Sequence, residues 1–276
     1  IQLKRLGEDP KCEITYIDNE TNDFHKKMKE NLSKNSFDLI IVSHVFYNSG
    51  LIYPLNQIEE LVALKKDASF ILDAYHGYCA VPTDLSKIGD HIFYMAGGYK
   101  YAQAGEGMCF TTIPKDCKLR PQITGWFASF STLEAGSAQI QYDSEGMRFW
   151  GSTMDFTAFF RFRKVWEFFA KENIQLKEMI AYINNLQIEF LKDNPLIENI
   201  LHSNTTNVGS FITLEFSSVE ETKSVHALLN KLNIITDFRG QRLRFGFGIY
   251  QTREQMVEIK KALKEIVKGS IPKLTH

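Results

Sequence analysis

Cysteines are few in this sequence, and none of them is spaced to share a metal ion with a neighbour. The four, Cys12, Cys79, Cys109 and Cys117, form no Cys-x-x-Cys pair and no Cys/His cluster of the kind that binds zinc. Free thiols in a reducing compartment are the simplest interpretation. We therefore expect a cytoplasmic protein with neither structural disulfides nor a metal site.

A surplus of basic residues is lacking as well. The chain has 32 Lys and Arg against 33 Asp and Glu, which gives a net charge of −1. Nucleic acids and anionic membranes are bound through basic patches, so this balance argues against both kinds of partner. No run of 18 apolar residues is present either, and we expect no membrane span.

The sequence also lacks a signal peptide and an initial Met. Its opening residues, IQLKRLGEDPKCEITYID, read like the middle of a domain, so we expect residues upstream of Ile1 to be missing from it. With 276 residues, of which 44% are hydrophobic, the chain is long enough to bury a core without disulfides or metals.

Short apolar runs alternate with helix-like segments in the first half of the chain. The expected strands and helices lie at 12–18, 20–32, 37–45, 55–65, 69–74, 91–97 and 107–114. The run FDLIIVSHV at 37–45 is typical of a strand buried on both faces. Alternation of such strands with helices predicts a mostly parallel sheet covered by helices, with ligands beyond the carboxyl ends of the strands.

The second half has a different pattern. Loops with several glycines fill residues 115–150, and two long helical segments follow between 155 and 193. The remainder reads as a strand, a helix, two strands and a helix, which predicts a small α+β unit. We therefore expect a large domain over 1–155, a linking helix over 156–175 and a small domain over 176–276.

Four chemically useful side chains follow the ends of consecutive predicted strands. They are Ser43, Asp73, His76 and Lys100. Each one alone has an ordinary interpretation: the aspartate caps a helix, the histidine is structural, and the lysine in its glycine-rich loop is solvated. Because the carboxyl ends of parallel strands converge on one edge of the sheet, the set as a whole favours a functional site.

Lys100 is the most informative of these residues. It lies in the run GGYKYAQAGEGM at 97–108, between two tyrosines and among small residues. A desolvated, partly apolar pocket lowers the pKa of a lysine, and the neutral amine that results is a nucleophile. The surroundings of Lys100 therefore indicate a reactive amine.

Three runs together resemble the kynureninase branch of the class V aminotransferase family: DAYHG at 73–77, FYMAGGYKYAQAGEGMCF at 93–110 and GWF at 125–127. These enzymes use pyridoxal 5′-phosphate (PLP) and have the fold called PLP fold type I. The resemblance covers nearly the whole chain, from Ser43 to the C-terminal helix. It implies a transferase, lyase or hydrolase that acts on an amino acid.

The resemblance also implies an architecture. The expected fold is α/β, with a mostly parallel sheet of the seven-stranded type, helices on both faces and a small C-terminal α+β domain. The part of the family that precedes these motifs, which cups the PLP phosphate, has no counterpart in this sequence.

The resemblance assigns most of the site. Lys100 forms the internal aldimine with the PLP aldehyde and then moves the substrate's α-proton. Asp73 pairs with the pyridinium nitrogen and keeps it protonated, so that the ring draws electrons from the substrate. His76 and Ser43 match residues that contact the cofactor, and Tyr99 matches a tyrosine whose hydroxyl reaches the phosphate.

Further positions in the resemblance complete the cofactor site. Tyr47 aligns with an asparagine that relatives place against the cofactor, but Asn48 lies next to it and is our candidate. Trp126, in GWF, matches a tryptophan that the neighbouring subunit contributes to the phosphate. Thr153 stands where relatives present a Gly-Thr to the partner's phosphate, although it also suits a helix N-cap. These positions imply a homodimer with shared active sites.

The segment FRGQRLRFGFGIY at 238–250 resembles the family segment that binds the substrate carboxylate. Arg244 is the candidate for this role, to which the planar guanidinium is suited. Arg242 would share its strand face and is the nearest competitor. Arg239 matches an arginine that follows an aspartate in kynureninases.

Other functions stay open at this point. The segment GSTMDFTA at 151–158 departs from the kynureninase pattern and favours a generic class V enzyme. A catalytically degenerate paralogue that serves as a binding or scaffold subunit is a second possibility. Cysteine desulfurase is disfavoured, because those enzymes need a nucleophilic cysteine shortly before the carboxylate-binding arginine and no cysteine follows Cys117.

Overall fold

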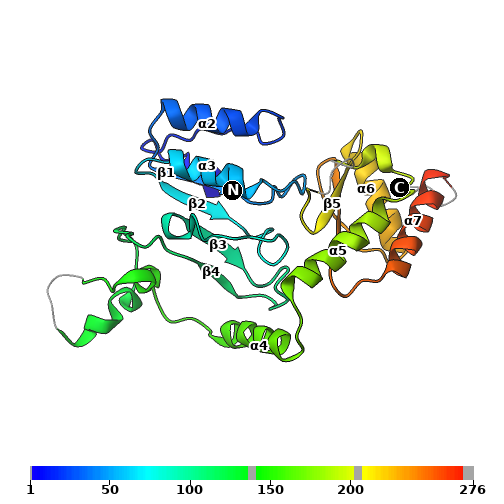
Figure 1. Ribbon diagram of the computed structural model, residues 1–276. Coiled ribbons are helices and arrows are strands. Elements are labelled where there is room, and N and C mark those ends of the chain that lie inside the picture. Colours follow the sequence, from blue (N-terminus) through cyan, green and yellow to red (C-terminus); the bar gives the residue numbers. More distant parts are fainter. Residues whose placement is uncertain (1, 136–140, 202–206, 270–276) are drawn as a thin grey trace.

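The computed structural model describes residues 2–135, 141–201 and 207–269 (Figure 1). These residues form two large hydrophobic cores and a small third cluster of Val45, Ala80, Val81 and Phe211. The first half holds the elements α1 (Gln2–Leu6), α2 (Phe24–Lys34), β1 (Leu39–Ser43), α3 (Leu55–Leu64), β2 (Ser69–Asp73), β3 (Phe93–Gly97) and β4 (Cys109–Thr111). The second half holds α4 (Thr157–Lys171), α5 (Leu176–Leu191), β5 (Phe211–Glu215), α6 (Val219–Lys231), β6 (Asp237–Arg239), β7 (Arg242–Gly246) and α7 (Arg253–Val267). Short 3₁₀ segments lie at Gly89–His91, Trp126–Ala135, Glu145–Phe149 and Ile197–Asn199.

The first sheet has the strand order β1-β2-β3-β4. Its first three strands are parallel, and β4 runs antiparallel to β3. Alternate strand residues such as Val42 and Leu72 point into the core, where α2 and α3 contribute Leu32 and Leu61. Figure 1 shows α2 and α3 next to each other above β1 and β2. The predicted α/β architecture is therefore confirmed, although the described residues supply four strands of a sheet expected to be of the seven-stranded type.

Two expectations for this sheet are wrong. Residues 12–18 form no strand, because a strand needs a hydrogen-bonded neighbour and none of the described strands pairs with them. The strand β1 is buried on one face only, since Leu39 is 41% and Ile41 is 40% exposed. An uninterrupted apolar run was thus insufficient to predict burial on both faces.

The second sheet has the order β5-β7-β6 with antiparallel neighbours throughout. Its core takes Leu214 and Leu243 from the strands, Phe190 from α5, and Met256 and Leu263 from α7. The amphipathic pattern of α5 accounts for its place here, with its apolar side against the sheet. The predicted small α+β unit is present, and the domain boundaries at 155 and 175 remain predictions that these two cores support.

A short joint connects the two sheets. The backbone N–H of Ile52 donates to the carbonyl of Asn207 at 2.9 Å, and the N–H of Gly209 donates to the carbonyl of Gly50 at 2.8 Å. Gly50 has φ of +81°, and a Cβ there would lie 2.9 Å from the carbonyl oxygen of Phe211. Only glycine suits this close approach, which brings the end of β1 to the start of β5.

Within the described ranges, no helix combines the length and the apolar character needed to cross a membrane.

Candidate active site

Two of the predicted site residues end neighbouring strands. Ser43 is the last residue of β1 and Asp73 the last of β2, and the two are paired in the parallel ladder. The Oδ1 atom of Asp73 accepts a hydrogen bond from the backbone N–H of Tyr75 at 3.1 Å. Asp73 therefore stabilises the turn after β2 with one oxygen, which is the ordinary role of an aspartate at this position.

Lys100 and His76 are in direct contact at this edge of the sheet. The Nζ atom of Lys100 lies 2.8 Å from Nε2 of His76. The other ring nitrogen, Nδ1, is buried and has no hydrogen-bond partner among the described residues. When Nε2 accepts from the lysine, the proton of a neutral imidazole is on Nδ1, so the site contains a buried N–H donor without an acceptor.

The protonation of both side chains is shifted by their surroundings. Burial lowers the pKa of the Lys100 ammonium below its ordinary value, and the negative charge of Asp73 only partly opposes this. Burial, together with the positive charges of Lys100 and Arg244, lowers the pKa of His76 to about 4. His76 is therefore neutral at pH 7, and Lys100 loses its proton more readily than a solvated lysine.

Two tyrosines pack over the turn that carries Lys100. The ring centroids of Tyr75 and Tyr99 are 5.9 Å apart, and Nζ of Lys100 lies 5.7 Å from the centroid of Tyr99. A Cβ on Gly97 would lie 2.5 Å from Cε1 of Tyr99 and 2.8 Å from Cε1 of Tyr75. A residue without a side chain is thus required at position 97 for both rings to keep their places.

The loop after Lys100 is held by helix α4. Arg161 donates from Nε to the carbonyl of Ala104 and from Nη2 to the carbonyl of Glu106. Between these carbonyls Gly105 has φ of +67°, and a Cβ there would lie 3.1 Å from Nε of Arg161. The Arg161 side chain of α4 therefore fixes the C-terminal end of the loop that follows Lys100.

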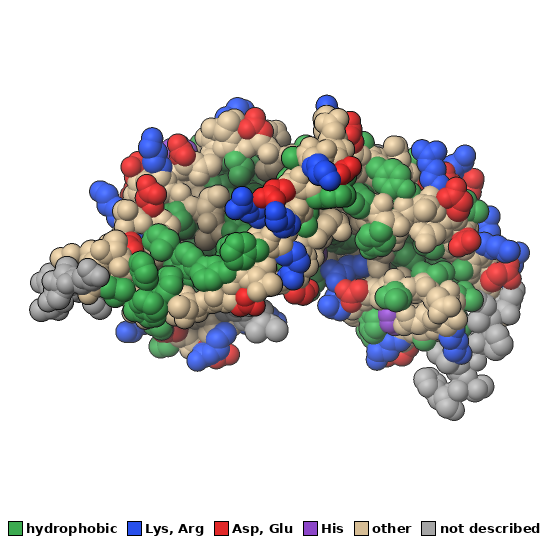
Figure 2. Space-filling view, turned by 90° about the horizontal axis from the view of Figure 1, so that it is seen from below, with side chains coloured by type: hydrophobic (Ala, Val, Ile, Leu, Met, Phe, Trp, Pro, Cys, Tyr) green, Lys and Arg blue, Asp and Glu red, His purple; other side chains and the backbone are tan. Residues whose placement is uncertain are grey.

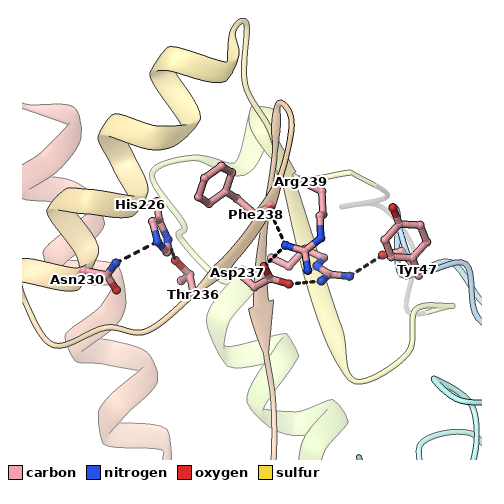
Figure 3. Close-up of polar contacts among 8 residues, drawn as sticks. Tyr47, His226, Asn230, Thr236, Asp237, Phe238 and Arg239 are labelled. Atoms are coloured by element: carbon pink, nitrogen blue, oxygen red, sulfur yellow. Dashed lines mark hydrogen bonds and ion pairs between the residues drawn. The ribbon is translucent and has the colours of Figure 1, made fainter. Parts of the chain in front are cut away.

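Arg244 faces the same site from the second sheet. Its Nη1 atom donates to the backbone carbonyl of Tyr47 at 2.9 Å, and Nη2 donates to Oδ2 of Asp237 (Figure 3). The rings of Tyr47 and Phe211 each lie 5.6 Å from its Cζ. Its side chain is only 14% exposed, so the guanidinium is fixed and largely desolvated next to His76.

Arg242, the competing arginine, is occupied by two carboxylates. Its Nε donates to Oε1 of Glu215 at 2.9 Å, and its Nη2 donates to Oε2 of Glu20 at 2.7 Å. The hydrogen bonds that Arg242 donates to Glu20 outweigh the cost of burial and raise the pKa of Arg242 above its ordinary value. Arg242 thus has two carboxylate partners, whereas Arg244 has one, Asp237, and lines the cavity described below.

The predicted phosphate residues Trp126 and Thr153 lie near each other but away from this cluster. The N–H of Phe127 donates to the carbonyl of Gly151 at 3.3 Å, which joins the two segments. Trp126 is 49% exposed, and Thr153 is exposed as well. In the described part of the chain, neither is joined to Lys100 by a hydrogen bond or ring contact.

The alternative role of Thr153 as a helix cap is wrong. Helix α4 begins at Thr157 and its N-cap position is Phe156, so the helix starts too late for Thr153 to cap it.

Asn48, which is partly buried, lies in the turn that brings Tyr47 to Arg244, and it is Tyr47 that contacts the guanidinium.

A large cavity lies along the second sheet and α7, and two residues of the first half, His76 and Tyr101, reach its wall. Its volume is about 1170 Å³, and its wall also includes Phe211, Asp237, Arg244 and Tyr250. The wall combines the largely desolvated Arg244 with aromatic surface, a neutral histidine and acidic residues. Arg244 is the group in this wall that is suited to a ligand carboxylate.

Asp237 and Arg161 were missed by the sequence analysis. Asp237 had a usable signal, because it precedes Arg239 in the Asp-x-Arg pattern. Arg161 had none, since it lies on a helix whose charged residues all read as a solvated face. The contacts of both depend on tertiary structure that a single sequence does not reveal.

Comparison with known proteins identifies a family. The model for "Aminotransferase class-V" matches residues 2–258. No curated protein matches the chain.

Several solved structures share the fold. A NifS-like protein from Rickettsia africae has a TM-score of 0.65 at 17% identity, over 88% of this chain and 66% of that one. C-DES, a cystine C–S lyase in complex with its product cysteine persulfide, has a TM-score of 0.70 at 17% identity, over 86% of this chain and 63% of that one. Ureidoglycine–glyoxylate aminotransferase from Bacillus subtilis has a TM-score of 0.61 at 17% identity, over 96% and 68%.

At such low identity the likeness shows the fold alone, and it confirms the predicted PLP fold type I. This chain spans about two thirds of the length of the structures that it matches.

Proposed function

The chain belongs to the class V aminotransferase family, and on that premise we propose that it is a PLP-dependent enzyme acting on an amino acid. The observation that carries the proposal is the contact between Lys100 and His76. An amine with a lowered pKa lies 2.8 Å from a neutral imidazole, at the edge where β1 and β2 end. A structural lysine gains nothing from such a position, whereas a nucleophilic amine requires it.

The residues at this edge fit the cofactor. In the described part of the chain, only Oδ1 of Asp73 is engaged in a hydrogen bond, which leaves Oδ2 for the protonated ring nitrogen of PLP. The buried Nδ1–H of His76 lacks an acceptor, and an oxygen of the cofactor would supply one. Lys100 would hold the cofactor covalently. When bound, PLP draws electrons from the α-carbon of the amino acid.

The protein's own groups divide the remaining work. Nζ of Lys100 removes and returns the proton at the α-carbon, a role for which its lowered pKa is suited. Asp73 keeps the ring nitrogen protonated by its negative charge. Arg244 binds the substrate carboxylate, because its guanidinium is fixed by Tyr47 and Asp237 and faces the cavity that His76 lines.

The remaining cofactor contacts are assigned to two subunits. We assign Ser43, Asn48 and Tyr99 to the cofactor from the same chain, with the hydroxyl of Tyr99 at the phosphate. Trp126 and Thr153, which the structure does not bring to Lys100 within one subunit, are assigned to the phosphate of a second chain. Exposed large hydrophobic side chains in the neighbourhood of the last two support a homodimer; they are Trp126, Phe130, Met154, Phe156 and Phe160. Figure 2 shows hydrophobic side chains gathered at the left end of the molecule, where Figure 1 places the segment between β4 and α4.

Two finer assignments belong to the same proposal. We place the chain in the kynureninase-like branch, on the combination of Asp73, His76 and the tyrosines that flank Lys100. We also propose a cytoplasmic location, which its four free thiols support. Desulfuration of cysteine is not proposed, because no cysteine follows Cys117.

The test uses the full-length protein loaded with PLP. The wild type should show the absorbance of bound cofactor, and borohydride reduction should fix the cofactor to Lys100, as mass spectrometry of the peptides reports. Lys100→Ala should lose the covalent adduct and lower turnover by many orders of magnitude, with the fold kept. Lys87→Ala is the matched control, since Lys87 pairs with Glu59 on the surface. An adduct on another lysine, or normal turnover by Lys100→Ala, would contradict the proposal.

A further inference from the structure

Asp237 lies between two arginines, Arg239 and Arg244, and lines the cavity. Its Oδ1 atom accepts from Nη1 of Arg239 at 2.5 Å, and its Oδ2 atom accepts from Nη2 of Arg244. The exposed fractions of the side chains rise outward, from 14% for Arg244 through 46% for Asp237 to 57% for Arg239. The carboxylate of Asp237 is thus held between Arg244, which is largely buried, and Arg239, which is solvated.

The position of Asp237 is fixed by the fold. Asp237 and Arg244 are directly paired on the antiparallel strands β6 and β7. The preceding residue, Thr236, is hydrogen-bonded through Oγ1 to Nδ1 of His226 at 2.8 Å, and Phe238 packs on the same histidine at 4.9 Å between ring centroids. Because both neighbours of Asp237 are anchored to α6, the carboxylate does not need Arg244 to stay at the cavity wall.

The charge at this wall is unusual for a site that binds an anion. Asp237 and Arg244 line the same cavity, so a carboxylate that reaches Arg244 comes close to the carboxylate of Asp237. The other Asp, Glu, Lys and Arg residues that line the cavity, all from α7, are Glu258, Lys261 and Glu265. The lining thus has three acidic residues, including Asp237, against two basic ones, and each added carboxylate makes the net charge more negative.

Asp237 is ionised under ordinary conditions. Burial alone would raise the pKa of its carboxyl group, but the hydrogen bond and charge of Arg244, with the charge of Arg239, lower it below the usual value. A negative group thus stands beside the cation that receives the substrate.

We propose that Asp237 is a specificity-determining residue, which admits amino acids with one carboxylate and rejects those with a second. The proposal rests on the function proposed above, in which Arg244 binds the α-carboxylate. When that carboxylate reaches Arg244, Asp237 stays in place through Arg239 and its backbone. The α-carboxylate, which all these ligands share, is compensated by Arg244. A side-chain carboxylate adds a second negative charge to a lining in which acidic residues, Asp237 among them, outnumber basic ones, whereas a neutral side chain adds none.

The expected size of this discrimination follows from the charges. Two like charges about 5 Å apart at a partly desolvated surface repel enough to lower affinity by roughly 10- to 100-fold. Arg239 reduces this repulsion because its positive charge partly neutralises Asp237. We therefore expect a difference in affinity closer to about 10-fold than to about 100-fold.

The experiment compares two ligands that differ by one charge and have the same shape, L-glutamine and L-glutamate. Their affinities for the PLP-loaded full-length protein are measured by calorimetric titration, which needs no turnover. The wild type should prefer L-glutamine by about 10-fold or more. In Asp237→Asn this preference should shrink by about 10-fold, mainly through tighter binding of L-glutamate, because the amide removes the charge and keeps an acceptor for Arg244.

Glu215→Gln is the matched control. It makes the same exchange of carboxylate for amide at the residue that pairs with Arg242, which precedes Arg244 by two positions on β7. Glu215 is not among the residues that line the cavity. It should leave the ratio of the two affinities unchanged. Asp237→Ser, which also removes the charge, serves as a second variant if Asp237→Asn does not fold.

Each other outcome contradicts the inference in a recognisable way. Equal weakening of both ligands by Asp237→Asn would make Asp237 a residue that only positions Arg244. An unchanged ratio, with PLP and L-glutamine still bound, would overturn the inference alone. If the PLP-loaded wild type bound neither ligand, the inference would fail while the proposed function would stand. If PLP did not become attached to Lys100, both would fail.

Discussion

The Nζ atom of Lys100 and the Nε2 atom of His76 are 2.8 Å apart, and burial lowers the pKa of both groups. Burial therefore disfavours the charged form of each side chain, and His76 is neutral at pH 7. His76 can then accept a hydrogen bond from Lys100 through Nε2, while its Nδ1–H is buried. This relationship determines how the protein should respond to acid.

Acid should destabilise the protein through His76. Its pKa is about 4 in the folded state and about 6.5 in the unfolded state. The unfolded chain binds more protons between these values, so stability is fully present above pH 6.5 and is lost as the pH falls toward 4. His76→Gln should recover about 1–2 kcal/mol of the unfolding free energy lost between pH 7 and pH 5, measured by urea titration at both pH values.

His44 provides the comparison for this prediction. His44, whose burial also lowers its pKa to about 4, should retain its own share of the slope in the His76→Gln protein. A slope identical to that of the wild type would contradict the burial of His76.

Arg161→Met should weaken cofactor binding although Arg161 is far from the reacting atoms. The change removes both hydrogen bonds to the carbonyls of Ala104 and Glu106 and frees the end of the Lys100 loop. Two charge-assisted bonds that are partly exposed contribute about 1–2 kcal/mol, so the Kd for PLP should rise roughly 10-fold. Absorbance titration with PLP measures it.

The same helix provides the comparison for Arg161. Arg163 pairs with Glu167 on the exposed side of α4, at 2.7 Å, and does not reach the lysine loop. Arg163→Met should leave the Kd for PLP within about a factor of two of the wild type. If Arg161→Met and Arg163→Met raised the Kd for PLP equally, the changes would act by destabilising α4 and not through the lysine loop.

Gly97→Ala should displace Tyr99 and with it the turn of Lys100. The added Cβ would lie 2.5 Å from Cε1 of Tyr99 and 2.8 Å from Cε1 of Tyr75, and neither ring can yield without moving the turn. We expect a loss of about 1–3 kcal/mol in unfolding free energy, measured by thermal and urea denaturation. Gly246→Ala adds the same methyl where nothing lies within 4 Å, and it should cost little.

Mixed dimers test the assignment of Trp126 and Thr153 to the partner's phosphate. Inactive Lys100→Ala subunits, mixed with subunits that carry inactivating changes at Thr153 or Trp126, should regain activity. One site of each mixed dimer then has an intact lysine from one chain and an intact phosphate contact from the other. Sedimentation of the mixture should show dimers. A monomer, or no recovery after re-equilibration, would place both residues within one subunit.

The parts of the fold that local pattern determines were predictable. The apolar runs that became β2 and β3 could be recognised as strands, and the end of each strand located Asp73 and the loop of Lys100 without any tertiary knowledge. Residues 12–18 have a similar apolar pattern and form no strand, because strand formation depends on a neighbour elsewhere in the chain. The exposed face of β1 has the same explanation, because the burial of a strand face depends on which other segments pack against it.

Much of the site depends on contacts between distant segments. The choice between Arg242 and Arg244 was open on the sequence, where both lie on one strand face, and it is Glu20 and Glu215 that separate them. Asp237 could be noticed as part of a motif, but its place between two arginines follows from the pairing of β6 with β7. The role of a charged residue can be predicted from the sequence only when its ion-pair partner lies close to it along the chain.

The link between Glu20 and Arg242 joins residues 222 positions apart, and it has a consequence for the order in which the protein is made. The first core uses residues between 28 and 96 and can assemble before the second sheet has been made. Glu20 and the segment around Gly50 must wait for β5 and β7, which are synthesised after α4 and α5. A ribosome stalled before Arg242 would therefore carry a folded first core in which the segment around Gly50 is still open to proteases, until β7 has been made and the second sheet has formed.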